Sequence, residues 1–138
     1  MTFAMLDVDH FKKINDQYGH MTGDRVLKSL ANVLKKRLRL VDSIGRYGGE
    51  EFAIILANCN AEQGVHVIDQ IREDFSKIEF GFEDLVFQVT FSVGMAGYPQ
   101  ITTAEQINLA ADQALYQAKE SGRNRVVAYQ VDDNERHG

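Results

Sequence analysis

The sequence predicts an α/β fold in which helices pack on a central mixed sheet of about five strands. The first observation is that short apolar or alternating runs, typical of strands, are separated by amphipathic stretches with helical periodicity. The second is the length, because 138 residues fit one domain with a sizeable core. The third is that no internal repeat or linker-like stretch interrupts the chain before its last few residues. We therefore predict one domain over residues 1–130 and a polar tail over residues 131–138.

Composition and charge exclude several classes of protein. Apolar residues make up 44% of the chain and charged residues 25%, as in ordinary soluble domains, and no apolar run is long enough to span a bilayer. The net charge of −5 argues against binding to nucleic acid or to an anionic membrane surface. The only cysteine, Cys59, rules out an internal disulfide and indicates a reducing compartment. We expect a cytoplasmic domain, whether or not its parent protein is anchored in a membrane.

The chain opens with a strand and a short helix. Residues 2–6 form an apolar run that predicts a strand buried on both faces, followed by the acids Asp7 and Asp9. A short helix is expected over residues 10–15, with Asp9 as its N-cap. Residues 17–24 are rich in helix breakers and predict a turn. Because a domain seldom begins with its central strand, we expect that a segment once preceded this one.

The middle of the chain alternates helices and strands. A strongly amphipathic helix is predicted from about residue 24 to residue 38. Two strands over residues 42–47 and 52–56 flank a pair of glycines and predict a hairpin. A third helix is expected over residues 61–78, and the alternating pattern of residues 87–95 predicts a half-buried strand.

The last part of the chain predicts one more helix and strand. Two overlapping capping boxes over residues 102–106 mark the start of a helix that runs to Ser121, with Gly122 at its C-terminal cap. Residues 125–129 then form a final strand. This order of elements fits a ferredoxin-like core whose sheet has the first strand and the hairpin in its middle.

The tip of the hairpin is the most informative stretch. Gly48 and Gly49 predict a tight turn, because glycine reaches positive φ without steric cost. Glu50 and Glu51 follow, although acidic residues are depleted in strands and adjacent like charges repel. A divalent cation would remove that repulsion, so the tip indicates a metal-binding hairpin. The alternative is a solvated polar turn.

The neighbouring strand adds to this signal. If it lies beside the hairpin, Asp7 comes near Glu50 and Glu51, and three carboxylates then converge as hard divalent cations require. The backbone N–H groups from His10 to Lys12 open a helix directly afterwards, and a helix N-terminus can bind phosphate. The sequence thus predicts a nucleotidyl-transfer site that depends on positioning and charge. Lys12 is either a phosphate contact or only a solvated cation.

Four motifs, in order and over nearly the whole chain, resemble the GGDEF domains of diguanylate cyclases in their GGEEF variant. They are Asp7-Val8-Asp9-His10-Phe11-Lys12-Lys13-Ile14-Asn15-Asp16, Gly19-His20 with Gly23-Asp24, Arg46-Tyr47-Gly48-Gly49-Glu50-Glu51-Phe52, and Ala114-Leu115-Tyr116-Gln117-Ala118-Lys119-Glu120-Ser121-Gly122-Arg123-Asn124. The resemblance implies the palm fold of nucleotidyl cyclases. It also implies that two GTP are condensed into cyclic dimeric GMP (cyclic di-GMP) with release of two pyrophosphates, by two protomers that face each other.

The resemblance also assigns the metal site. Asp7, Glu50 and Glu51 match the metal ligands, with the Val8 carbonyl as a further candidate. The family implies two Mg²⁺ ions per active site, with Mn²⁺ as the alternative. Glu50 and Glu51 are the expected catalytic residues, and Glu50 is favoured for helping to deprotonate the attacking 3′-hydroxyl.

Other matching positions are expected to hold the substrate. Asn15 and Asp24 match the guanine-reading residues, which suits guanine because a carboxylate accepts from its N1–H and 2-amino groups. Lys119 and Arg123 match the phosphate-binding cations, and their spacing of four places them on one helix face or its immediate extension. The start of the short helix supplies further substrate contacts, namely His10, Phe11 and Lys12.

A second site is predicted at Arg39-Leu40-Val41-Asp42. This stretch resembles the inhibitory RxxD site of the family, at which the product would stack on and bond to Arg39 and Asp42. An Arg-x-x-Asp is common by itself, and the alternative is a helix-end cation next to a strand-start acid. Five residues separate Asp42 from Gly48, as in the family pattern, and this spacing favours the inhibitory site. Arg72 is the candidate for the second arginine that the family uses.

The resemblance leaves three readings of function. The leading one is a diguanylate cyclase domain, and the second is a non-catalytic module that binds GTP or cyclic di-GMP and signals to a partner. The third is a related palm enzyme that acts on another nucleotide. The acids at positions 7, 50 and 51 favour the enzyme, and Asn15 with Asp24 favours guanine. The chain lacks the helix and the Asp-x-Leu-Thr-x-Leu segment that usually open such domains. We expect an upstream sensor or receiver domain in the parent protein.

Overall fold

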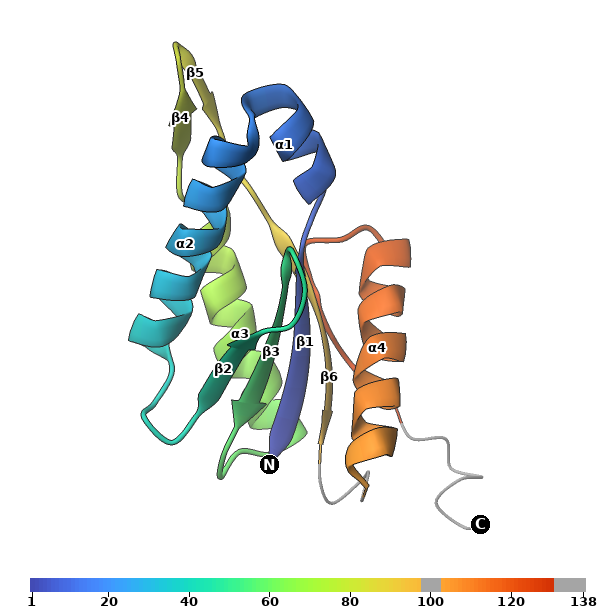
Figure 1. Ribbon diagram of the computed structural model, residues 1–138. Coiled ribbons are helices and arrows are strands. Elements are labelled where there is room, and N and C mark those ends of the chain that lie inside the picture. The colour runs from blue at the N-terminus through green and yellow to red at the C-terminus, as the bar shows by residue number, and fades with distance from the viewer. Residues whose placement is uncertain (98–102, 131–138) are drawn as a thin grey trace.

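The computed structural model describes residues 1–97 and 103–130, so the predicted tail and Thr102 lie outside the described residues (Figure 1). Its main sheet is five-stranded, in the order β2-β3-β1-β6-β7, with β1 in the middle. The β6–β7 pair is parallel and the other pairs are antiparallel, which confirms the mixed sheet. The strands of this sheet are β1 (Thr2–Val8), β2 (Ser43–Arg46), β3 (Glu51–Leu56), β6 (Phe91–Gly97) and β7 (Val126–Ala128).

Helices cover both faces of this sheet (Figure 1). Alternate residues of a strand point to opposite faces, so Leu6 joins a core with α2 and α3 while Met5 joins a second core with α4. The helices are α1 (Phe11–Tyr18), α2 (His20–Arg37), α3 (Ala61–Ser76) and α4 (Ala104–Glu120). Within residues 1–97 and 103–130, no helix is long and apolar enough to cross a membrane.

Helix α4 lies directly against β6 because of Gly94. A Cβ atom at this position would lie 2.1 Å from both the Ala111 carbonyl oxygen and the Leu115 nitrogen. Only glycine therefore allows this approach of helix to strand. The packing fixes the end of α4, which carries Lys119, relative to the sheet.

The strand expected over residues 87–95 is wrong in extent and burial. The sheet strand β6 starts at Phe91, and all seven of its residues are buried because helices pack on both faces of the sheet. The preceding residues form a separate hairpin of β4 (Phe80–Phe82) and β5 (Leu85–Phe87) beside α1 (Figure 1). Tyr18 stacks on Phe87 with ring centroids 4.0 Å apart, a tertiary contact that alternation in the sequence cannot indicate.

The turn expected over residues 17–24 is also wrong. Helix α1 extends to Tyr18 and α2 begins at His20, so Gly19 alone separates them, with φ 88°. Thr22 and Gly23 are poor helix formers, but both are buried in the first turns of α2, where packing outweighs propensity.

Candidate active site

Strand pairing places the three predicted acids at one edge of the sheet. In the antiparallel β1–β3 pair, Asp7 lies opposite Glu51. The Val8 N–H donates to the Glu50 carbonyl oxygen over 3.2 Å, which extends the pairing to the hairpin loop. The acids at positions 7, 50 and 51 therefore come from two adjacent strand ends, as the sequence predicted.

The hairpin loop differs from the expected tight turn. It contains four residues between the strands and is closed by the Tyr47 N–H, which donates to the Glu51 carbonyl oxygen over 2.8 Å. Among the described glycines only Gly19 and Gly122 have positive φ, so Gly48 and Gly49 do not. A longer loop can turn without positive φ. A Cβ at Gly49 would meet no atom within 4 Å, so this side of the loop is open to a ligand.

A small cavity of about 200 Å³ lies where the ends of β1 and α4, the start of α1 and the hairpin loop meet. It brings together eight of the predicted site residues and adds Asp9. Arg123 follows the end of α4 and has a left-handed backbone, with φ 62°. Although it is not on the helix, it lines the same cavity as Lys119. The cavity is lined by Asp7, Val8, Asp9, His10, Phe11, Lys12, Glu50, Lys119 and Arg123.

The charges around this cavity are only partly balanced. Lys119 Nζ forms an ion pair with the buried Asp7 carboxylate, across 112 residues of sequence. Burial raises the pKa of Glu51 above its ordinary value, and the negative charges of Asp7 and Glu50 add to this effect against the opposing charge of Lys119. The site thus has an excess of negative charge that an additional cation would stabilise.

The carboxylates are suited to a metal ion but are not gathered around one point. Within residues 1–97 and 103–130, no three His, Cys, Asp or Glu side chains are close enough to hold a metal ion. Carboxylate oxygens are nevertheless the ligands that hard divalent cations prefer, and the pKa of Glu51 is raised first by burial and then by the nearby acids Asp7 and Glu50. The residues present therefore fit a divalent cation, provided that Lys119 releases Asp7.

The predicted guanine readers lie together at the junction of α1 and α2, but not in the 200 Å³ cavity. The Asn15 side chain packs against Gly23, the residue before Asp24. A Cβ at Gly23 would lie 1.9 Å from Asn15 Oδ1, so only glycine leaves room for this side chain. In the described part of the chain, Asn15 Oδ1 is buried without a hydrogen-bond partner. Asp24 lines another cavity, of about 450 Å³, together with Arg46 and Phe52.

Asp9 has a different role from the one expected. It does not cap α1, whose N-cap is His10 in a left-handed conformation, and no side chain in the described residues caps this helix. The Asp9 carboxylate is instead buried, and it accepts hydrogen bonds from Thr90 Oγ1 and Ser92 Oγ, both over 2.6 Å. Sequence reasoning missed this contact; the available signal was two hydroxyl residues, two positions apart, at the start of the adjacent strand.

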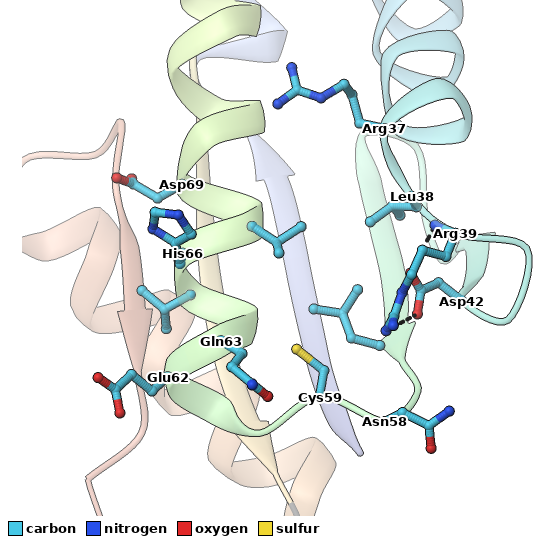
Figure 2. Close-up of a pocket in the computed structure, with 13 residues that line it drawn as sticks. Arg37, Leu38, Arg39, Asp42, Asn58, Cys59, Glu62, Gln63, His66 and Asp69 are labelled. Carbon is cyan, nitrogen blue, oxygen red and sulfur yellow. Dashed lines mark hydrogen bonds and ion pairs between the residues drawn. The ribbon is translucent and has the colours of Figure 1, made fainter.

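The predicted inhibitory residues line a cavity of about 860 Å³ between the end of α2 and α3 (Figure 2). The Arg39 and Ala57 N–H groups donate to the Asp42 carboxylate, each over 3.0 Å. Arg72 does not line this cavity; it donates to Asp69 and to Asn124 over 2.7 and 2.8 Å. Arg37 lies at the rim instead (Figure 2).

Comparison with known proteins points to one family. A family model described as "Diguanylate cyclase, GGDEF domain" matches residues 1–125. The chain is 41% identical over 126 residues to the diguanylate cyclase DgcP of Pseudomonas aeruginosa, with 91% of this chain and 19% of that protein covered. It superposes with a TM-score of 0.87 and 37% identity on the active GGEEF domain of a diguanylate cyclase from Vibrio cholerae, over 95% of this chain and 83% of that one. For the GGDEF domain of DgcB from Caulobacter crescentus in complex with cyclic di-GMP, the TM-score is 0.87, with 35% identity over 94% of this chain and 78% of that one. The chain belongs to the GGDEF domain family of diguanylate cyclases.

Proposed function

We propose that this domain condenses two GTP into cyclic di-GMP and releases two pyrophosphates. The observation that carries the proposal is the 200 Å³ cavity, in which acids, a helix N-terminus and three cations meet. In each half-reaction a ribose 3′-oxygen attacks the α-phosphorus of the other GTP, and the bond to the leaving pyrophosphate breaks. Phosphoryl-transfer catalysis of this kind depends on positioning and charge stabilisation, which these groups supply.

Cationic and backbone groups would bind the triphosphate. The start of α1 presents its backbone N–H groups and Lys12 to the cavity, and Lys119 and Arg123 face it from the end of α4. Oriented N–H groups and cations stabilise the negative charge that develops on the leaving pyrophosphate. Lys119 can serve in this way only after it leaves Asp7.

Asp7, Glu50, Glu51 and the Val8 carbonyl would hold the divalent cations. We propose two Mg²⁺ ions per site, with Mn²⁺ as the alternative. When bound, such ions lower the pKa of the attacking hydroxyl and neutralise charge on the phosphates. Glu50 lies in the hairpin loop at the cavity wall, where its carboxylate would take the proton of the 3′-hydroxyl.

Guanine would be read at the junction of α1 and α2. A buried amide oxygen without a partner costs about 1–3 kcal/mol. No hydrogen bond to Oδ1 holds the Asn15 amide in its present orientation, so turning it toward a base costs no such bond. The exposed Asp24 carboxylate would accept from the guanine N1–H and 2-amino groups, a pair of donors that adenine lacks.

Catalysis would require a homodimer. The cavity has one set of candidate phosphate-binding groups and would therefore bind the phosphates of one GTP. The reaction is symmetric in its two substrates, so a second protomer would present the second GTP across a twofold axis. We propose that an upstream sensor or receiver domain controls this pairing in a longer cytoplasmic or membrane-anchored parent protein.

The Arg39–Asp42 cavity would bind the product and inhibit the enzyme. The Arg39 side chain is 56% exposed, and a guanidinium suits stacking and bidentate bonding to guanine. At about 860 Å³ it is also large enough for a dinucleotide. The same observation supports a second candidate function, a non-catalytic module that binds cyclic di-GMP and signals to a partner.

Product analysis separates these functions. The chain, fused to a dimerising coiled coil, is incubated with GTP and Mg²⁺, and the nucleotides are separated by chromatography. We expect cyclic di-GMP and pyrophosphate from GTP and no cyclic dinucleotide from ATP. Unchanged GTP together with tight binding of added cyclic di-GMP would overturn the enzyme in favour of the receptor module.

A further inference from the structure

We propose that Asp9 is a positioning residue that holds two walls of the active-site cavity and, through one of them, orients Arg123 toward the GTP phosphates. The inference rests on the proposed function for the role of Arg123, but the contacts of Asp9 stand independently. Asp9 is buried, lines the cavity, and has no part in the roles assigned above.

The first wall is the start of α1. His10 directly follows Asp9 and has φ 56° and ψ 33°, a left-handed conformation that is uncommon for residues other than glycine. The Asp9 N–H donates to the Thr90 carbonyl oxygen over 2.9 Å, so the chain is fixed to the neighbouring strand immediately before this strained residue. Such strain persists only where the surroundings impose it.

The second wall is the loop after α4. The Arg123 N–H donates to the Ala118 carbonyl oxygen over 2.9 Å and the Gly122 N–H to Lys119 over 3.5 Å, the two bonds of a Schellman C-terminal cap. Such a cap needs one left-handed residue, and Gly122, with φ 129°, supplies its positive φ. Arg123 and Asn124 nevertheless continue with φ 62° and 49°. Two successive left-handed residues other than glycine cost about 2 kcal/mol or more in total.

Asp9 is the group that offsets this strain. The Asn124 N–H donates to Asp9 Oδ2 over 3.0 Å and to Ser92 Oγ over 3.2 Å. On the other side, Asn124 Oδ1 accepts from Arg72 of α3 over 2.8 Å. The residue after Arg123 is thus fastened to the end of β1, to β6 and to α3. Because a backbone held at residue 124 restricts the direction of its neighbour, the Arg123 side chain stays at the cavity.

Two substitutions of Asp9 distinguish the effect of its hydrogen bonds from the effect of its charge. All three side-chain contacts of Asp9 come from donors, which suits an acceptor-only carboxylate. Asparagine can keep the network, because its Oδ1 can accept from Thr90 and Asn124 while its amide group donates to the Ser92 hydroxyl. Alanine removes every side-chain bond.

A double-mutant cycle tests the positioning role. Binding of GTP with Mg²⁺ to the full chain is measured by calorimetry for wild type, Asp9→Ala, Arg123→Ala and the double variant. We expect each single variant to bind about tenfold more weakly, the equivalent of one charge-assisted hydrogen bond, and the double variant to bind no more weakly than Arg123→Ala. Asp9→Asn should bind within about twofold of wild type, and so should the control Asp16→Ala, which removes an exposed acid from α1.

A second readout does not depend on nucleotide. Hydrogen exchange of the Asn124 amide, followed by nuclear magnetic resonance, should be fast in Asp9→Ala and slow in wild type and Asp9→Asn. If Asp9→Ala does not fold, Thr90→Val replaces it, with a smaller but still non-additive loss expected. Additive losses in the cycle, or an Asn124 amide that exchanges equally in all variants, would overturn the inference. A wild-type chain that binds no GTP would instead overturn the proposed function.

Discussion

The two ends of β3 carry two sites of opposite character. At its start, Glu51 lies opposite the buried Asp7, with unbalanced negative charge nearby. At its far end, the Asp42 carboxylate is also buried but already has donors from Arg39 and Ala57. At the first site burial and nearby acids disfavour the charge of Glu51, whereas the carboxylate of the second site is already hydrogen-bonded. A cation at the first site would relieve this cost but must displace Lys119 from Asp7, and a ligand at the second site must compete with the bonds between Arg39 and Asp42.

The sizes of the two cavities show the same contrast. The cavity at Asp7 measures about 200 Å³ and is closed in by four segments, while the cavity at Arg39 measures about 860 Å³ and lies between α2 and α3. A small cavity at which charged groups from several segments meet is typical of a catalytic site, where groups must be preorganised. A roomy cavity with an exposed arginine is typical of a site that only binds.

The largest effect is expected from Glu50→Ala. If the hairpin acids activate the attacking hydroxyl, turnover of GTP should fall by about a hundredfold or more, while the fold and cyclic di-GMP binding at Arg39 stay intact. Product chromatography, circular dichroism and calorimetry measure the three properties. An active Glu50→Ala protein would remove the catalytic assignment from this end of β3.

Gly94→Ala should affect the sites at the two ends of β3 differently, because it displaces α4. Its Cβ would meet α4 backbone at 2.1 Å, so we expect the free energy of unfolding to fall by about 3 kcal/mol, measured by urea denaturation. GTP binding should weaken because α4 carries Lys119, whereas cyclic di-GMP binding between α2 and α3 should remain. Gly45→Ala is the control, since a Cβ at this position would meet no atom within 4 Å. Equal loss of both ligands would show that the two ends are not independent.

Arg39→Ala should affect only the larger cavity. Loss of its charge-assisted bonds to the product should weaken cyclic di-GMP binding by about 2 kcal/mol, or roughly thirtyfold, and relieve product inhibition. The initial rate of GTP turnover should not change. Lys36→Ala is a matched control, because it removes an exposed cation of α2 outside the lining of this cavity. Inhibition that persists in Arg39→Ala would refute the second site.

The smallest effect concerns Glu51 in the metal-free protein. Its pKa is raised above 4.5 in the folded state, so the folded state holds the proton more strongly than the unfolded state. The resulting contribution to stability is present below pH 4.5 and is lost as the pH rises through the folded pKa. In EDTA, Glu51→Gln should therefore be slightly more stable than wild type at pH 7, and this advantage should vanish below pH 4.5. Urea denaturation at both pH values measures this; a less stable variant at pH 7 would show that the acids are already balanced.

The sequence was a good guide wherever the evidence lay within one segment. The apolar run before Asp7, the hairpin around Gly48 and the cap of the last helix all indicate local structure, and these elements were found with small errors at their ends; the Asp9 cap and the turn over residues 17–24 were the exceptions. Asn60 and Thr103 cap α3 and α4 through bonds to residues three positions later, a spacing that is visible in the chain itself. The half-buried strand failed because the burial of β6 depends on two helices that are distant in sequence.

The amino-acid sequence by itself determined the family, the order of the helices and main-sheet strands, and the acids of the candidate site, because these depend on residue types at fixed spacings; it did not predict the β4–β5 hairpin. Only the tertiary structure decided how the charges pair. It turned Asp9 from a helix cap into the anchor of Asn124, placed Lys119 on Asp7, and directed Arg72 away from Arg39. Each of these contacts joins residues more than fifty positions apart, and such pairing is set by the packing of sheet and helices rather than by local pattern.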